Sequence, residues 1–104
     1  MVLNWIFVTF FFAVVLFSCE SAPAVLEDGS PDAARLYNIH CAACHKPDGT
    51  GGISGAKSLV SSSLQVKELE QVIRNGQGDM MPFKSILNDA EISAVAAFVH
   101  DFKY

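Results

Sequence analysis

The residues of this 104-residue chain with the clearest chemistry lie at positions 41–45, which read CAACH. The spacing C-x-x-C-H is the motif for covalent attachment of a c-type haem. Two thiols three positions apart can each add to one vinyl group of the porphyrin, and the next residue can supply an imidazole nitrogen to the iron. The sequence therefore predicts one haem c, with Cys41 and Cys44 as attachment residues and His45 as an axial ligand.

Three other uses of this cysteine pair fit the sequence less well. A zinc site needs a fourth ligand, and the adjacent side chains of Cys44 and His45 are poorly placed to share one tetrahedral ion. A thioredoxin-like dithiol follows a strand and precedes a helix, whereas here a helical pattern precedes the pair and a Gly-rich stretch follows it. A disulfide between Cys41 and Cys44 would close too small a loop to stabilise the fold much.

Three helices are expected around this motif. The first begins with Ser30 as N-cap and Pro31 as first helical residue and runs to about residue 40. The second covers about 66–75, with Gly76 just after its end, and the third begins at Asn88, which forms a capping-box pair with Glu91. Residues 46–63, rich in Gly and Ser, predict a long irregular loop, which wrapping around a cofactor would explain.

The charged residues are unevenly distributed along the chain. The net charge is −4, and residues 20–32 contribute all of it through four acidic side chains without a Lys or Arg. Residues 33–104 are neutral, with seven acidic and seven basic side chains. Because no basic cluster is present to pair with phosphates, we expect no nucleic-acid partner.

The first 18 residues are expected to be a lipoprotein-like signal peptide. Residues 1–17 contain 15 apolar residues and no charge, and the run ends in Leu16-Phe17-Ser18-Cys19, which resembles the lipobox of bacterial lipoproteins. That resemblance implies cleavage before Cys19, lipidation of Cys19, and an exported protein held at the membrane on the periplasmic or cell-surface side. An uncleaved membrane anchor and a soluble secreted protein cut near Ala24 are the alternatives. Residues 19–31 then form an acidic tether, and 32–104 the folded domain.

Residues 32–104 as a whole resemble class I (mono-haem) cytochromes c. The resemblance rests on a helix with Tyr37, the CAACH run, the Gly-rich loop, the N-G…M-P-F pattern from Asn75 to Phe83, and an amphipathic C-terminal helix with aromatic residues. It implies an all-α fold in which three main helices and a Gly-rich loop surround one covalent haem. It also implies that the first and last helices cross closely.

The resemblance further concerns the second axial ligand. Thioether sulfur is a soft ligand suited to haem iron, and the residues alone leave both Met80 and Met81 open. In the family the axial Met directly precedes a Pro, which implies Met81, and Pro82 restricts Met81 to extended geometry. Many relatives use a Pro carbonyl to accept the proton of the proximal His; the corresponding residues 55–59 read GAKSL, so the acceptor is left open.

These ligands determine the expected function. With His45 and Met81 both bound, the iron has no open position, which favours a one-electron carrier over an enzyme. Met/His ligation raises the reduction potential, which suits delivery of electrons to a terminal oxidase or their receipt from a quinol-oxidising complex. A haem sensor or peroxidase-like enzyme with a labile Met ligand, and the electron-entry subunit of a larger oxidoreductase, are the alternatives.

Overall fold

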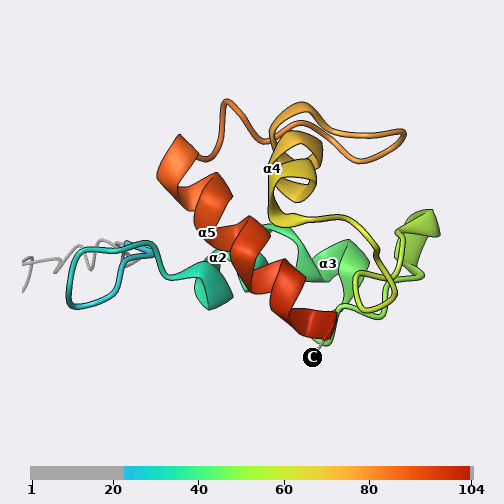
Figure 1. Cartoon of the computed structure of the whole chain (residues 1–104), viewed down its shortest axis with the longest axis horizontal. Coiled ribbons are helices and arrows are strands. Elements are labelled where there is room, and N and C mark those ends of the chain that lie inside the picture. Colours follow the sequence, from blue (N-terminus) through green and yellow to red (C-terminus); the bar gives the residue numbers. More distant parts are fainter. Residues whose placement is uncertain (1–22, 104) are drawn as a thin grey trace, which may run out of the picture.

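The computed structural model describes residues 23–103, so the apolar leader and Cys19 lie outside the described residues. Within 23–103 the regular structure is helical, with only two isolated β-bridges, and the predicted all-α fold is confirmed (Figure 1). The elements in chain order are α2 (Ala33–His40), α3 (Ala42–His45), the 3₁₀ turn η1 (Ile53–Gly55), α4 (Val66–Asn75), α5 (Asp89–His100) and the 3₁₀ turn η2 (Asp101–Lys103).

The start of α2 differs from the prediction. Its N-cap is Asp32, whose carboxylate accepts a hydrogen bond from the backbone N–H of Arg35 at 3.1 Å. The predicted cap, Ser30, instead hydrogen-bonds to Asp28 in the preceding turn, and Pro31 pairs with Val25 in an isolated bridge. Both predicted residues are therefore used by the turn before the helix, and the next residue able to cap takes the role.

The ends of α4 and the start of α5 are as predicted. Helix α4 spans Val66–Asn75 and stops at Gly76, whose φ of 74° is one that glycine adopts readily. At the start of α5 the Asn88 side chain accepts from the Glu91 N–H at 2.9 Å, and the Glu91 carboxylate accepts from the Asn88 N–H at 2.8 Å. This is the predicted capping box, which satisfies two backbone N–H groups at the start of α5.

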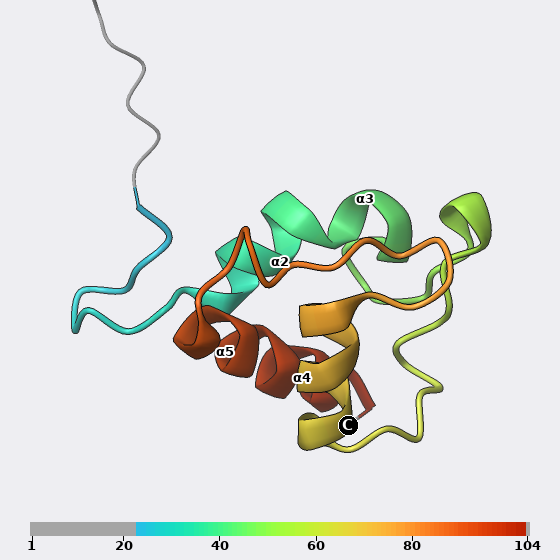
Figure 2. The same ribbon diagram turned by 90° about the horizontal axis from the view of Figure 1, so that it is seen from above.

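Helix α5 is the centre of the core, since it packs on both α4 and α2 (Figures 1 and 2). Three of its side chains, Ile92, Val95 and Ala96, are completely inaccessible to solvent. The Tyr37 ring of α2 lies 5.5 Å from the Phe98 ring and 5.1 Å from the Phe102 ring, measured between centroids. The first and last helices therefore cross closely, as the resemblance to class I cytochromes c implies.

The segment just before α2 is folded into a turn. The backbone N–H of Leu26 donates to the Ser30 carbonyl at 2.8 Å, and that of Asp32 to the Ala24 carbonyl at 2.9 Å. Ala24 also packs against the hydrophobic core, so this part of the predicted tether is not extended. None of the helices within residues 23–103 combines the length and apolar character needed to cross a bilayer.

Candidate functional site

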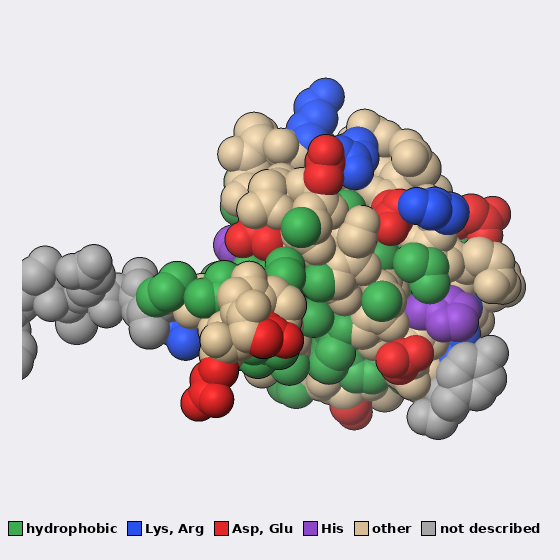
Figure 3. All heavy atoms as spheres, turned by 60° about the vertical axis from the view of Figure 1, so that its left-hand side comes forward, with side chains coloured by type: hydrophobic (Ala, Val, Ile, Leu, Met, Phe, Trp, Pro, Cys, Tyr) green, Lys and Arg blue, Asp and Glu red, His purple; other side chains and the backbone are tan. Residues whose placement is uncertain are grey.

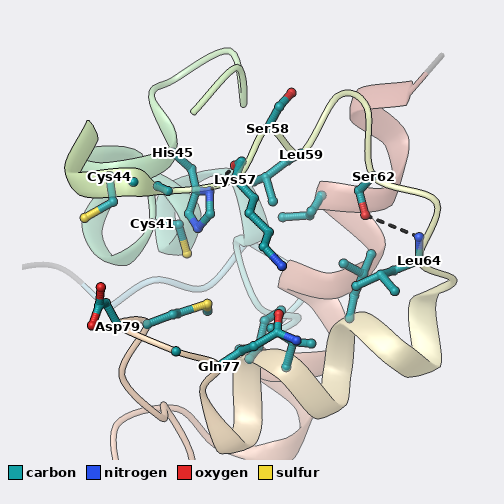
Figure 4. Close-up of a pocket in the computed structure, with 18 of the residues that line it drawn as sticks. Cys41, Cys44, His45, Lys57, Ser58, Leu59, Ser62, Leu64, Gln77 and Asp79 are labelled. Atoms are coloured by element: carbon teal, nitrogen blue, oxygen red, sulfur yellow. Dashed lines mark hydrogen bonds between the residues drawn. The ribbon is translucent and has the colours of Figure 1, made fainter. Parts of the chain in front are cut away.

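A deep pocket of about 1040 Å³ lies between α3, the loop after η1, α4 and the turn that leads to Phe83 (Figure 4). This is at the upper end of the range for small-molecule and cofactor pockets, roughly 300–1,000 Å³. Its interior is mostly apolar, and its larger aliphatic and aromatic lining residues are Ile53, Leu59, Leu64, Leu69, Val72, Ile73, Phe83, Val95 and Val99. Such a pocket suits a large, flat, apolar group.

The predicted attachment residues lie together at this pocket. Within the CAACH run, Ala42–His45 form the single helical turn α3 with Cys41 as its N-cap, an element that the sequence reasoning did not predict. The turn is closed by the His45 N–H donating to the Cys41 carbonyl at 2.9 Å. Cys41, Cys44 and His45 all line the pocket, and Figure 4 shows them on one side of it. One turn of helix thus presents both thiols and the imidazole to the same space.

The orientation of His45 is set by the loop opposite it. Its Nδ1 lies 2.9 Å from the backbone carbonyl oxygen of Lys57. Because a carbonyl can only accept, Nδ1 carries the proton and the lone pair is on Nε2, which is the state a metal-binding imidazole needs. The acceptor that the sequence left open is therefore the Lys57 carbonyl.

Gly51 lets the loop approach closely enough for that bond. Its φ is +72°, and a Cβ at this position would lie 2.5 Å from the Lys57 carbonyl oxygen, so any side chain would push the acceptor away. The Gly51 N–H also donates to the His45 carbonyl at 2.9 Å. Sequence reasoning did not single out Gly51; the Gly49-Thr50-Gly51-Gly52 cluster was the available signal.

Tyr37 fastens the start of this loop to the helical core. Its hydroxyl donates to the Lys46 carbonyl at 2.6 Å. Burial, with smaller contributions from the nearby Cys41 and Asp48, raises the pKa of Tyr37 to about 12. The hydroxyl therefore keeps its proton, and the hydrogen bond, throughout the neutral and moderately alkaline range.

The two methionines lie on the turn between α4 and α5. Gln77 and Met80 exchange backbone hydrogen bonds of 3.1 and 3.0 Å. Gly76 permits this tight return, since a Cβ there would overlap the Met80 carbonyl oxygen. Both Met80 and Met81 line the pocket; Met80 is partly buried against the core, whereas 53 % of Met81 is exposed. The turn offers either thioether to the pocket.

The thiol chemistry also distinguishes this site from a redox dithiol. Burial, and then the neighbouring Cys44, raises the pKa of Cys41 to about 11, whereas attacking thiols of dithiol oxidoreductases have lowered pKa values.

Among residues 23–103, no three His, Cys, Asp or Glu side chains converge to hold a metal ion. His40 is half-buried along the pocket, its ring 6.0 Å from that of Phe83.

An all-helical fold that opens a haem-sized apolar pocket beside a C-x-x-C-H turn is that of a class I c-type cytochrome. Residues 30–99 match the family described as cytochrome c oxidase, cbb3-type, subunit III. Cytochrome c6 of Leptolyngbya boryana is 38 % identical over 73 residues, which cover 64 % of this chain and 85 % of that protein. A cytochrome c6-like protein of Nostoc sp. is 31 % identical over 103 residues, covering 93 % of this chain and 88 % of the relative.

A solved structure gives the same result. The c-type cytochrome KustC0563 superimposes with a TM-score of 0.63 at 28 % identity, over 69 % of this chain and 98 % of that one. The chain therefore belongs to the c-type cytochrome family that this matching model defines. It is a mono-haem electron-carrier cytochrome, its cofactor is one covalent haem c, and the apolar pocket beside the C-x-x-C-H turn fits that group.

Proposed function

We propose that Cys41 and Cys44 hold the haem through thioether bonds, and that His45 and Met81 are the axial ligands of its iron. The observation that carries this is the position of both thiols and of His45 on one helical turn facing the apolar pocket. Met81 is chosen over Met80 because it directly precedes Pro82. The exposed Met81 side chain at the pocket edge is free to swing onto the iron.

With two protein ligands, the domain functions as a one-electron carrier and not as an enzyme. The haem supplies the change between ferric and ferrous iron. The Lys57 carbonyl holds the His45 ring, and the Tyr37 hydroxyl holds the start of the loop that follows His45. Apolar side chains shield the pocket from water. Since none of these contacts needs to change with the iron charge, little rearrangement accompanies electron transfer.

The partners we propose are membrane-associated respiratory proteins, a terminal oxidase or a quinol-oxidising complex. The description of the matching family, subunit III of a cbb3-type oxidase, supports the first of these. Acidic and basic side chains are interspersed on the face shown in Figure 3, and residues 33–104 are neutral overall. The charge of the domain therefore supports a protein partner and not a nucleic acid.

The optical spectrum of the purified ferric protein tests the carrier assignment. Thioether ligation should give a weak far-red sulfur-to-iron band, and the ferrous protein should not bind carbon monoxide. A ferric protein without that band, whose ferrous form binds carbon monoxide readily, would instead be a haem sensor or peroxidase-like enzyme with a labile Met ligand.

Membrane attachment through Cys19 is a separate proposal. Export to the periplasmic or cell-surface side is supported by the apolar leader and the lipobox-like Leu16–Cys19 run. An acylated Cys19 would carry a diacylglycerol and an amide-linked chain, and two or more chains give stable membrane attachment where one is marginal. We expect the mass of the membrane-extracted N-terminal peptide to show a lipid-modified Cys19 as the first residue.

The variant Cys19→Ser should abolish this modification. The product is then an uncleaved hydrophobic anchor, or a soluble cytochrome released by cleavage near Ala24. A wild-type protein with an intact Met1, or with an unmodified start at Val25, rules out the lipoprotein. Neither result affects the haem assignment, because Cys19 lies outside the domain of residues 32–104.

A further inference from the structure

The turn before α2 is firmly joined to the folded domain. Ala24 packs against the hydrophobic core, and its carbonyl accepts a hydrogen bond from the Asp32 N–H at 2.9 Å. The Leu26 N–H donates to the Ser30 carbonyl at 2.8 Å and closes the turn. The chain from Ala24 onward therefore moves with the domain and adds nothing to the length of the tether.

Only a short piece of chain is left between Cys19 and that turn. Residues 20–23 separate Cys19 from Ala24, and five residue steps span at most about 18 Å. A domain of this size is about 30 Å across, so a membrane-held Cys19 keeps this end of the domain next to the bilayer. An uncleaved leader gives the same result, because its apolar run ends at Phe17.

The turn presents two adjacent apolar side chains to solvent. Val25 is 48 % exposed and Leu26 is 49 % exposed, and Figure 3 shows hydrophobic side chains where the described chain begins. The backbone of Leu26 is already paired, since its N–H donates to Ser30 and its carbonyl accepts from the Gly29 N–H at 2.9 Å. Backbone groups that are satisfied within the turn lower the cost of entering a region poor in water. The Leu26 side chain can therefore leave water without stranding its own backbone.

The charges of this segment decide which kind of surface suits it. Residues 20–32 carry four acidic side chains and no basic one, so an anionic surface repels this end of the domain. The hydrogen bonds from the Ser30 hydroxyl and N–H lower the pKa of Asp28, which keeps this carboxylate charged and in contact with water at neutral pH. The attraction of the turn is therefore apolar and shallow, and it fits a lipid surface with zwitterionic headgroups.

We propose that Val25 and Leu26 insert into the interfacial region of the bilayer and so restrict the orientation of the domain on the membrane. This rests on the membrane attachment proposed above. Two half-exposed side chains bind a membrane weakly by themselves, but the anchor holds them at a high effective concentration beside it. Figures 1 and 2 place the turn at one end of the domain, with α3 and η1 toward the other. The C-x-x-C-H turn then lies away from the lipid, where the projecting part of a redox partner can reach it.

A fluorescent label in the turn tests the insertion in the full-length, membrane-anchored holoprotein. Glu27→Cys supplies the one reactive thiol, because Cys19, Cys41 and Cys44 are all bonded in that protein. The thiol carries a nitrobenzoxadiazole label, and the vesicles contain phosphatidylcholine and phosphatidylethanolamine, with or without nitroxide-bearing lipids as quencher. We expect the quencher to lower the emission about twofold or more, since insertion brings the label to the acyl boundary. Quenching by the haem is equal in both vesicles and cancels.

Two further variants are the controls. In a background of Val25→Ser with Leu26→Ser, the label at Glu27→Cys should lose this effect and change by less than about 1.2-fold. Val60→Cys carries the label on the loop beside the pocket, at a side chain that is 41 % exposed and outside the pocket lining. Its emission should be insensitive to the quencher in both backgrounds.

Flotation of the vesicles separates this inference from the anchor itself. Both backgrounds should float with the vesicles, because the anchor supplies the attachment, and both should keep the haem absorbance of wild type, because the two replaced side chains lie at the surface. Equal quenching in the two backgrounds, or a floating protein whose label at Glu27→Cys is not quenched, would overturn the insertion and leave the anchor intact. A protein that does not float would overturn the anchor, and the insertion with it.

Discussion

Replacing Cys41 and Cys44 together with serine should give a chain that carries no haem and is largely unfolded. Among residues 23–103 the hydrophobic core has only ten buried residues, and half of them also border the pocket: Leu69, Ile73, Phe83, Val95 and Val99. Without the macrocycle, the pocket of about 1040 Å³ that these side chains border would hold water against a mostly apolar lining. A domain of this size has little apolar surface to spare, so loss of its central group removes most of the driving force for folding.

The measurements are mass spectrometry of the denatured protein and far-ultraviolet circular dichroism during heating. Wild type from a haem-loading host should show one added haem after denaturation, because thioether bonds survive unfolding. The double serine variant should show none, with most of its helical signal and its cooperative transition lost. Ala43→Ser, an exposed change in the same turn, is the control and should keep both. An unmodified wild-type chain, or a double variant with wild-type helicity, would contradict the assignment.

The helices could be predicted because their signals are local. The apolar spacing within Val66–Asn75, the glycine after it, and the Asn88–Glu91 pair each lie within one or two turns. The predicted start of α2 was wrong because three neighbouring residues, Ser30, Pro31 and Asp32, could each begin the helix. The competition was decided by the turn before the helix, where Ser30 is bound to Asp28, and this depends on contacts that helix propensity does not describe.

The features of the site also fall into those that a local sequence pattern predicts and those that depend on the folded chain. The chemistry of the CAACH run could be predicted from its residue types and spacing alone. The acceptor for His45 could not be assigned, because its bond to the Lys57 carbonyl joins residues 12 positions apart through a loop without regular structure. That bond depends on Gly51, where two backbone segments approach too closely for a side chain. Such an approach is a property of the folded loop and leaves only a cluster of glycines in the sequence.

Replacing Met81 with alanine should open the sixth coordination position of the iron. We expect loss of the far-red band, carbon monoxide binding by the ferrous form, and a reduction potential lower by on the order of 0.1–0.3 V, a part of the roughly 0.8 V range that axial ligands govern. The potential falls because thioether ligation favours ferrous iron. The side chain is 53 % exposed and on a turn, so its removal should change the fold much less than the spectrum.

Met80→Ala is the matched control, since it removes the same side chain one position earlier. Met80 is partly buried against the core, so its loss should lower the free energy of unfolding by about 1–2 kcal/mol while the potential and the far-red band stay near those of wild type. Pro82 is the reason for the difference, because it holds Met81 extended at the point where the chain passes the pocket. If the two variants exchange phenotypes, Met80 is the ligand and Met81 the packing residue. The haem attachment and the fold, which rest on Cys41, Cys44 and the helices, would stand in either case.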